Sequence, residues 1–178
     1  MVRNRRLEAA YNSISMAADK NVDQLDLRIL EILQANARET QADIARDIGL
    51  APSAVLERVR KLEARGVIRG YSALIDPRAL ALPILAFVAV RSDEVGADED
   101  RVAQALAQSP EVLEVHHVAG DDCYLIKVRA RDAEHLGQML RTRFARIPGV
   151  RSTRTTIVLE TVKETSRLPV PQKQEVNS

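Results

Sequence analysis

Five basic side chains between Ala51 and Gly70 are the residues of this chain best suited to binding chemistry. The segment carries net charge +3, because only Glu57 and Glu63 oppose them. The five are Arg58, Arg60, Lys61, Arg65 and Arg69. Cations along one helix can bind DNA phosphates and the edges of bases in the major groove. A charged helix face is more often only solvated, so the surrounding elements must decide between the two readings.

The stretch from Thr40 to Tyr71 has the signals of two short helices joined by a tight turn. Thr40 can cap the first helix, and Asp43 can complete a capping box. Gly49 can end that helix, because glycine reaches the left-handed backbone conformation without steric cost. Pro52 suits the first position of the second helix, where a missing N–H is harmless. This spacing predicts a helix-turn-helix.

The second helix is predicted to have a buried stripe and an outer face. Val55, Val59 and Leu62 fall at i, i+4 and i+7 and form the stripe. The outer face has short residues near the helix start and cations further along, as entry into a major groove requires. The predicted DNA-contacting residues are Thr40, Gln41, Ser53, Ala54, Glu57, Arg58, Arg60 and Lys61.

Two further elements complete this half of the chain. A helix begins near Asn21 with Asp23 as its N-cap, and its apolar face must pack on the other two helices. Alternating residues predict a strand over 67–75, which Asp76 and Pro77 end.

The second half of the chain changes to short apolar runs typical of strands. Strands are predicted at 84–90, 112–118, 124–128 and 150–162, with a helix around Val102 and Leu106 and another from Ala133 to Ile147. The order βαββαβ predicts an antiparallel sheet with both helices on one face, a ferredoxin-like sandwich. Val, Ile and Ala side chains would be exposed on the other face, so a second copy of the chain is expected to cover it.

No set of residues in this half predicts catalysis or a metal site. His116 and His117 are adjacent, so they point to opposite faces of a strand, and His135 lies on a helix. A structural or interfacial role is therefore favoured over metal ligation. Asp121 and Asp122 form an acidic pair whose commonest role is turn chemistry. We predict no catalytic residue, no metal and no cofactor.

Composition restricts the class of protein. With 178 residues, 46% of them hydrophobic but only 3% aromatic, the chain can form one or two aliphatic cores. The net charge is +1, with +2 in residues 1–75 (12 basic, 10 acidic) and −1 in residues 76–178 (14 basic, 15 acidic), so affinity for nucleic acid must come from local placement. Cys123 is the single cysteine, which excludes an intramolecular disulfide. Without a long apolar run or a signal peptide, we expect a cytoplasmic protein with no membrane partner.

The order of these blocks resembles a known family. LDLRILEILQANAR and ADIARDIGLAPSAVLERVRKLEARGVIRGYSALIDP are similar to the N-terminal half of the Lrp/AsnC (leucine-responsive, "feast/famine") transcription regulators. The resemblance continues through AFVAV, PEVLEVHHVAGDDCYLIKVR and IPGVRSTRTTIVLETVK, and spans roughly Val22 to Leu168. It implies an α+β fold, with an N-terminal three-helix winged helix-turn-helix domain and a C-terminal βαββαβ ferredoxin-like (RAM-type) domain.

The resemblance also implies domain borders and an assembly. The helix-turn-helix domain would cover 21–70, and the effector-binding and oligomerisation domain 83–168. Residues 71–82 would form a linker strand and hinge that pairs across a homodimer, and dimers would assemble to an octamer. Residues 169–178 would form a C-terminal tail.

An effector site follows from the resemblance too. Gly120, Asp121, Asp122, Cys123 and Tyr124 resemble the family's Gly-Asp-x-Asp-Tyr motif, which lies beside the site of an amino acid effector. Cys123 replaces the second acid of that motif, which shifts the expected ammonium contact to Asp121 or Asp122. The other positions implied are Ala145, Thr156, Ile157 and Val158, with Thr156 replacing an aromatic residue.

The first twenty residues lie outside the family pattern and are expected to be a mobile extension. Arg3, Arg5 and Arg6 allow two readings of it. The extension could be a basic arm that touches the DNA backbone, or it could have no role and even precede a true start at Met16. We favour the second reading.

These observations favour a sequence-specific, DNA-binding transcriptional regulator of amino acid metabolism whose partners are double-stranded DNA and a small amino acid effector. The alternative is a small-molecule-binding or metabolic enzyme built on the ferredoxin-like domain, with the N-terminal helices used for assembly. The absence of a catalytic constellation in the sequence counts against that alternative.

Overall fold

The computed structural model describes residues 22–93, 99–120 and 122–170. These residues form two compact units, one made of residues 22–73 with 164–170 and the other of residues 74–163. Residues 164–168, which were predicted to belong to the second domain, therefore cluster with the first unit. The predicted N-terminal extension, Asp121 and residues 171–178 of the predicted tail lie outside the described residues.

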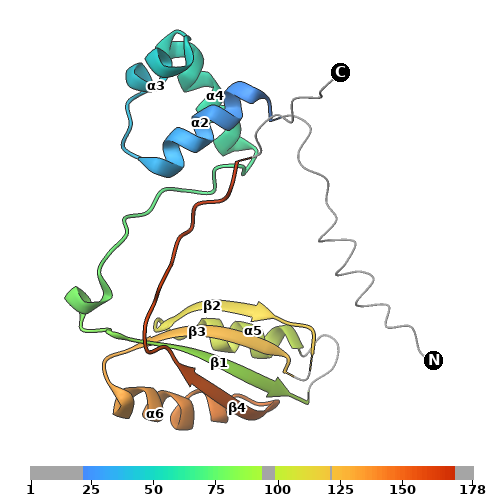
Figure 1. The fold of residues 1–178 in the computed structure, drawn as a ribbon. Helices are drawn as coiled ribbons and strands as arrows, with labels where there is room; N and C mark the ends of the chain where they lie inside the picture. Colours follow the sequence, from blue (N-terminus) through green and yellow to red (C-terminus); the bar gives the residue numbers. More distant parts are fainter. Residues whose placement is uncertain (1–21, 94–98, 121, 171–178) are drawn as a thin grey trace, which may run out of the picture. The chain divides into compact units, whose positions relative to one another are not determined.

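Three helices make up the first unit: α2 (Gln24–Ala35), α3 (Gln41–Ile48) and α4 (Pro52–Ala64) (Figure 1). Their buried side chains form one small aliphatic core, which consists of Ile29, Ile44, Ala45, Val55, Val59 and Leu62. The predicted stripe on α4 is confirmed, because all three of its residues lie in this core. Helices this short gain most of their stability from such packing rather than from helix propensity.

Capping side chains fix where the first two helices begin. The Asp23 carboxylate accepts the Asp26 N–H at 2.8 Å and the Asp26 carboxylate accepts the Asp23 N–H at 3.3 Å, a complete capping box. At α3 the Thr40 hydroxyl oxygen accepts the Asp43 N–H at 3.1 Å and its O–H donates to Asp43 Oδ2 at 2.6 Å. Asp43 thus closes the box through the side chain of Thr40 rather than its backbone. Gly49 ends α3 with φ of 72°, as predicted.

Helix α4 begins without a side-chain cap, because Ala51 occupies the N-cap position in an extended conformation. We expect Ala51→Ser to raise the free energy of unfolding by about 0.5 to 1 kcal/mol, since a serine hydroxyl there can accept an otherwise unpaired N–H of the first turn. Urea unfolding measures the difference. Ala51→Val, which cannot cap, is the control, and equal stability of the serine and valine variants would contradict the expectation.

The strand predicted over 67–75 is wrong for the single chain, because residues 67–76 form no β-ladder. A strand requires a hydrogen-bonded neighbour, and neither unit supplies one to this segment. Its apolar side chains are left exposed, with Leu74 at 92% and Ile75 at 62% of full exposure. A short 3-10 helix, η1 (Pro77–Leu80), follows, and the Asp76 carboxylate caps it.

The second unit is a βαββαβ sandwich, as predicted. Its elements are β1 (Ile84–Ser92), α5 (Glu99–Ala107), β2 (Val112–His117), β3 (Tyr124–Ala130), α6 (Ala133–Thr142) and β4 (Val150–Ile157) (Figure 1). The strands are antiparallel in the order β2-β3-β1-β4. Val102 and Leu106 on α5 share a core with Leu136 and Met139 on α6. Both helices therefore cover the same face of the sheet.

Two predicted ends differ from the structure. Helix α6 was predicted to reach Ile147 but ends at Thr142. The 3-10 turn η3 (Phe144–Arg146) follows, and this change of helix type places Phe144 in the core at 1% exposure. Strand β4 was predicted to reach residue 162 but ends at Ile157. Its pairing runs out where β1 begins, and the last contact is the Val158 N–H donated to the Leu85 carbonyl at 2.9 Å.

The open face of the sheet is less apolar than predicted. The register places Val88, Val90, Ile126 and Val128 on the helix side, where all are fully buried. The open face carries Leu85, Phe87, Ala89 and Leu125 among charged residues such as Lys127, whose ammonium lies 3.1 Å from Glu114 Oε1. Alternation along the strands was predicted correctly, but these valines and the isoleucine lie on the helix side rather than on the open face.

Candidate nucleic-acid interface and small-molecule site

The exposed side of α4 carries most of the predicted DNA contacts. Ser53, Glu57, Arg60 and Lys61 are exposed and Ala54 is partly exposed. Lys61 Nζ lies 2.6 Å from Glu57 Oε1, and this contact lowers the pKa of the Glu57 carboxyl. Such an exposed i,i+4 pair is weak, so Lys61 can exchange Glu57 for a phosphate. The side of α4 away from the core therefore presents small residues first and cations after them.

Arg58 does not belong to that exposed side, and its predicted placement on the outer face is wrong. Its Nη1 lies 2.7 Å from Asp23 Oδ2 and 2.7 Å from Asp26 Oδ1, both at the start of α2. Only 9% of the Asp26 side chain is exposed, and its two carboxylate partners raise the pKa of Arg58 further. Arg58 follows Val55 by three residues, so its long side chain runs beside the buried stripe and joins α4 to α2.

Thr40 and Gln41, the two predicted contacts outside α4, are both exposed at the start of α3. The hydroxyl of Thr40 is engaged with Asp43, and it is the main cause of the lowered pKa of that carboxyl, with a smaller effect from Arg46. The structure thus assigns Thr40 a capping role. Gln41 lies beside a cavity.

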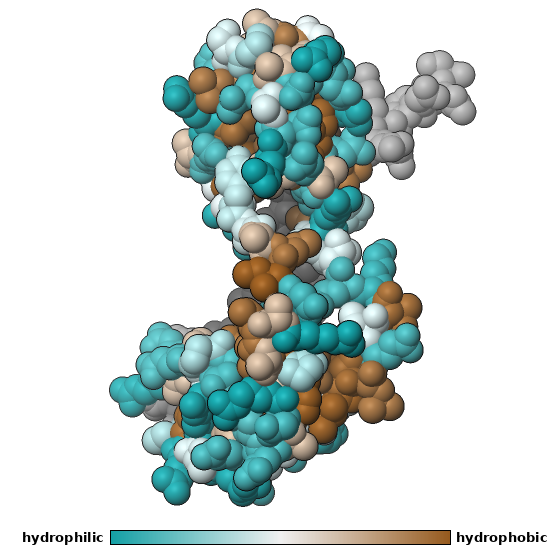
Figure 2. Space-filling view, turned by 90° about the vertical axis from the view of Figure 1, so that its left-hand side faces the viewer, coloured by the Kyte–Doolittle hydropathy of each residue, from teal (hydrophilic) through white to brown (hydrophobic). Residues whose placement is uncertain are grey.

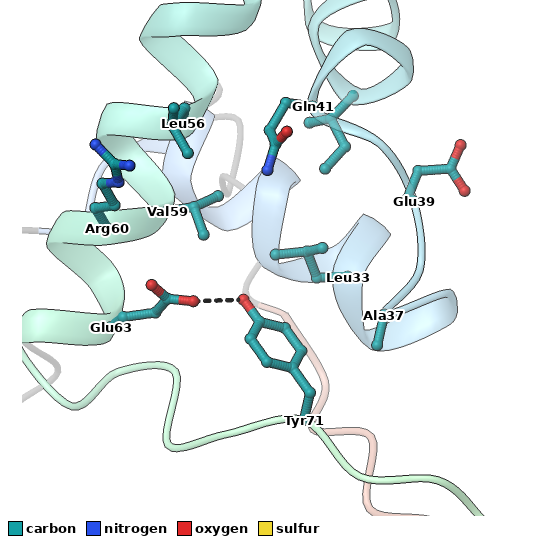
Figure 3. Close-up of a pocket in the computed structure, with 10 residues that line it drawn as sticks. Leu33, Ala37, Glu39, Gln41, Leu56, Val59, Arg60, Glu63 and Tyr71 are labelled. Carbon is teal, nitrogen blue, oxygen red and sulfur yellow. Dashed lines mark hydrogen bonds between the residues drawn. The ribbon is translucent and has the colours of Figure 1, made fainter.

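That cavity, of about 270 Å³, lies between the helices of the first unit (Figure 3). Leu33, Leu56 and Val59 supply its apolar lining, and Arg60 and Glu63 are at its α4 side. Tyr71 closes one end, where its hydroxyl donates to Glu63 Oε1 at 2.9 Å. Burial, followed by the contact with Glu63, raises the pKa of Tyr71. No local sequence signal indicates this contact, which attaches the segment leaving the first unit to α4.

In the second unit Gly120, Asp122 and Cys123 of the predicted effector motif lie between β2 and β3, and Tyr124 begins β3. Gly120 has φ of 141°, in the region that favours glycine. Cys123 is held by the backbone of Ser92, which donates its N–H to Sγ and accepts the thiol hydrogen, both at 3.4 Å. Tyr124 is 2% exposed and lies in the core, with its ring 5.2 Å from that of His117. Within one chain the ring of Tyr124 therefore lies on the helix side of the sheet and is not accessible to an effector.

Among the described residues of this motif, Asp122 forms an ion pair with a residue of another strand. Its Oδ2 lies 2.8 Å from Nη2 of Arg154 on β4. The Asp122 side chain is 24% exposed and that of Arg154 is 78% exposed. A carboxylate and a guanidinium at the rim of the sheet match the ammonium and carboxylate of an amino acid. Arg154 was missed because only the sheet register brings it next to the turn.

The remaining predicted effector positions lie in different places. Thr156 shares the open sheet face with Arg154, two residues away on the same strand. Ile157 has the opposite orientation and is 47% exposed, and Val158 follows the strand. Ala145 is exposed on η3, in the helix layer. Within one chain the structure thus brings together Asp122, Arg154 and Thr156, but not Ala145.

The histidines are placed as predicted. His116 Nε2 lies 3.1 Å from Glu114 Oε2 on the open side, whereas His117 faces Tyr124 on the other. His116 and then Lys127 lower the pKa of the Glu114 carboxyl. In the described part of the chain no three His, Cys, Asp or Glu side chains come together in a way that could hold a metal ion. No helix in that part is both long and apolar enough to cross a membrane.

Two family models match successive parts of the chain. Residues 22–69 match a model described as winged helix-turn-helix DNA-binding. Residues 85–168 match a model described as Lrp/AsnC ligand binding domain. The first match contains α3, α4 and their turn, and the second contains the turn at Gly120 and Arg154.

Individual proteins resemble the chain over nearly their whole length. The HTH-type transcriptional regulator FL11 of Pyrococcus horikoshii is 40% identical over 84% of this chain and 97% of its own. The leucine-responsive regulatory protein of Escherichia coli K12 is 37% identical over 85% and 93%. A solved structure of a feast or famine regulatory protein from M. tuberculosis complexed with L-methionine has a TM-score of 0.77 and 36% identity, over 84% of this chain and 99% of that one.

Proposed function

Since the chain belongs to the Lrp/AsnC family of DNA-binding transcriptional regulators, we propose that α4 is its recognition helix and that a small amino acid controls its binding to double-stranded DNA. The observation that carries the first part is the exposed side of α4, with Ser53 and Ala54 near its start and Arg60 and Lys61 further along. Short residues let a helix approach the floor of the major groove, and the cations reach phosphates and base edges. The protein would act in the cytoplasm and regulate genes of amino acid metabolism.

The proposed effector site is built around Asp122 and Arg154. Asp122 would accept the ammonium of the amino acid and Arg154 would bind its carboxylate, so that the ligand replaces their mutual contact at 2.8 Å. Thr156, two residues from Arg154 on the open face, would contact the ligand side chain. The complex of a similar regulator with L-methionine supports an amino acid as the ligand class.

A homodimer that assembles further, to an octamer, is part of the same proposal. Apolar side chains are exposed on the segments that join the two units, including Leu74 at 92%, Leu159 at 99% and Val162 at 91%. Figure 2 shows hydrophobic surface on these joining segments, bordered by hydrophilic side chains. Exposed apolar patches of this kind mark protein interfaces. A dimer would present two recognition helices to half-sites about one helical turn apart.

We expect Asp122→Asn and Arg154→Gln each to weaken binding of the effector about tenfold, since each removes a charge-assisted hydrogen bond to the ligand. A thermal-shift screen of the common amino acids identifies the ligand, and calorimetry then gives its affinity. The variant pair Asp93→Asn and Arg151→Gln is the matched control, because these residues form an exposed ion pair at 3.2 Å in the same unit. Unchanged affinity in Asp122→Asn would show that the ammonium is bound elsewhere.

A further inference from the structure

After the last strand the chain returns to the first unit and docks on the C-terminal end of α2. The Leu168 N–H donates to Gln34 Oε1 at 2.7 Å, and Gln34 Nε2 donates to the Leu168 carbonyl at 3.1 Å. One side-chain amide thus satisfies both backbone groups of Leu168, as a neighbouring β-strand would. The Leu168 side chain is 72% exposed, so this contact recognises the backbone rather than an apolar side chain.

Arg167 provides a second contact beside the first. Its Nη2 donates to the carbonyl of Ala35, the last residue of α2, at 3.0 Å. The last carbonyls of a helix lack intrahelical partners and carry negative partial charge, which favours a cation. Helix α2 has no basic residue in its own last turn, so Arg167 supplies that charge from the far end of the sequence.

The local sequence prepares this segment for docking. The Arg167 N–H donates to the Thr165 hydroxyl at 3.1 Å, which forms a compact turn before the contact. Pro169 restricts Leu168 to an extended conformation, because its ring disfavours the helical region for the preceding residue. The local sequence therefore preorganises residues 165–168 in the conformation that binds the end of α2.

The chain consequently connects the two units twice. One connection leaves the first unit at Tyr71, which is attached to α4 through Glu63, and the other returns through residues 158–163 to the contact at Gln34. We propose that residues 165–168 are a second tether of the DNA-binding unit, and that effector control of DNA binding passes through it. The control part of this inference rests on the proposed function. The two connecting segments attach to the helix-turn-helix at two points, the α4 end through Glu63 and the α2 end through Gln34, so a change that the effector causes in the sheet unit can reach both helices.

The test uses the full chain with Gln34→Ala and Arg167→Ala combined. Gln24→Ala is the control, because Gln24 is an exposed glutamine at the other end of the same helix. Hydrogen exchange at the Leu168 amide measures docking. DNA affinity with and without each common amino acid measures control. In the double variant we expect exchange about tenfold faster or more, effector-free DNA affinity within about twofold of the native chain, and a reduced effect of the amino acid.

Several outcomes would overturn the inference. Unchanged exchange at Leu168 would show that the segment does not dock through Gln34 and Arg167. Faster exchange with a full amino acid response would show that control does not pass through the tether. If no amino acid alters DNA affinity of the native chain, effector control in the proposed function fails, whereas the exchange result still decides whether the tether exists. Gln34→Glu, which keeps the acceptor but loses the donor, replaces the double variant if that does not fold.

Discussion

Replacement of Arg58 by alanine is expected to lower the free energy of unfolding of the helix-turn-helix unit by about 2 to 3 kcal/mol. Arg58 Nη1 lies 2.7 Å from a carboxylate oxygen of Asp26, whose side chain is only 9% exposed. Removal of the guanidinium leaves that charge buried without its partner, and an unpaired buried charge is more destabilising than the pair was stabilising. Water reaches the site because 29% of the Arg58 side chain is exposed, which limits the loss. Urea unfolding measures it.

Arg60→Ala is the matched control for this prediction. Arg60 lies two positions further along the same helix and is exposed, so its loss should change the free energy of unfolding by no more than about 0.5 kcal/mol. DNA binding by the Arg58 variant should fall together with its folded fraction. If Arg58→Ala were as stable as the native chain but bound DNA more weakly, Arg58 would be a DNA-contacting residue of the outer face and not a structural one.

The double variant Arg60→Gln with Lys61→Gln is expected to bind all DNA sequences at least about tenfold more weakly at moderate salt. Both side chains are exposed on the side of α4 proposed to face the duplex. Each cation that meets a phosphate releases a counterion, so the slope of log affinity against log salt should decrease in magnitude by about two. Fluorescence anisotropy over a series of salt concentrations measures both quantities, and the free energy of unfolding should stay near that of the native chain.

Arg141→Gln with Arg146→Gln removes the same number of charges from exposed positions in the second unit. This control separates a local contact from the effect of net charge, which is only +1 for the whole chain. If the two double variants weakened DNA binding equally, Arg60 and Lys61 would not be specific contacts of the DNA interface.

Local signals predicted the elements of this chain well. The cap at Thr40, the left-handed Gly49 and the stripe from Val55 to Leu62 are all confirmed, because each depends on residues within one or two turns of helix. The order βαββαβ is confirmed for the same reason, since alternation and helix-breaking residues mark each boundary nearby in sequence.

Features that depend on distant residues could not be predicted in this way. Arg58 fits an outer helix face by spacing, but Asp23 and Asp26, more than 30 positions earlier, turn its side chain inward. The contact between Asp122 and Arg154 requires the register of the sheet, and the docking of Leu168 on Gln34 joins residues 134 positions apart. The strand over 67–75 failed for a related reason, because alternation alone does not supply a pairing partner.

Sequence-specific binding to DNA can be tested by one comparison of affinities. The native chain is used to select a duplex from a random pool, and its dissociation constants for that duplex and for a scrambled version are measured by anisotropy at fixed salt with heparin as competitor. We expect the selected duplex to bind at least about a thousandfold more tightly than the scrambled one. Equal dissociation constants for the two duplexes would contradict it.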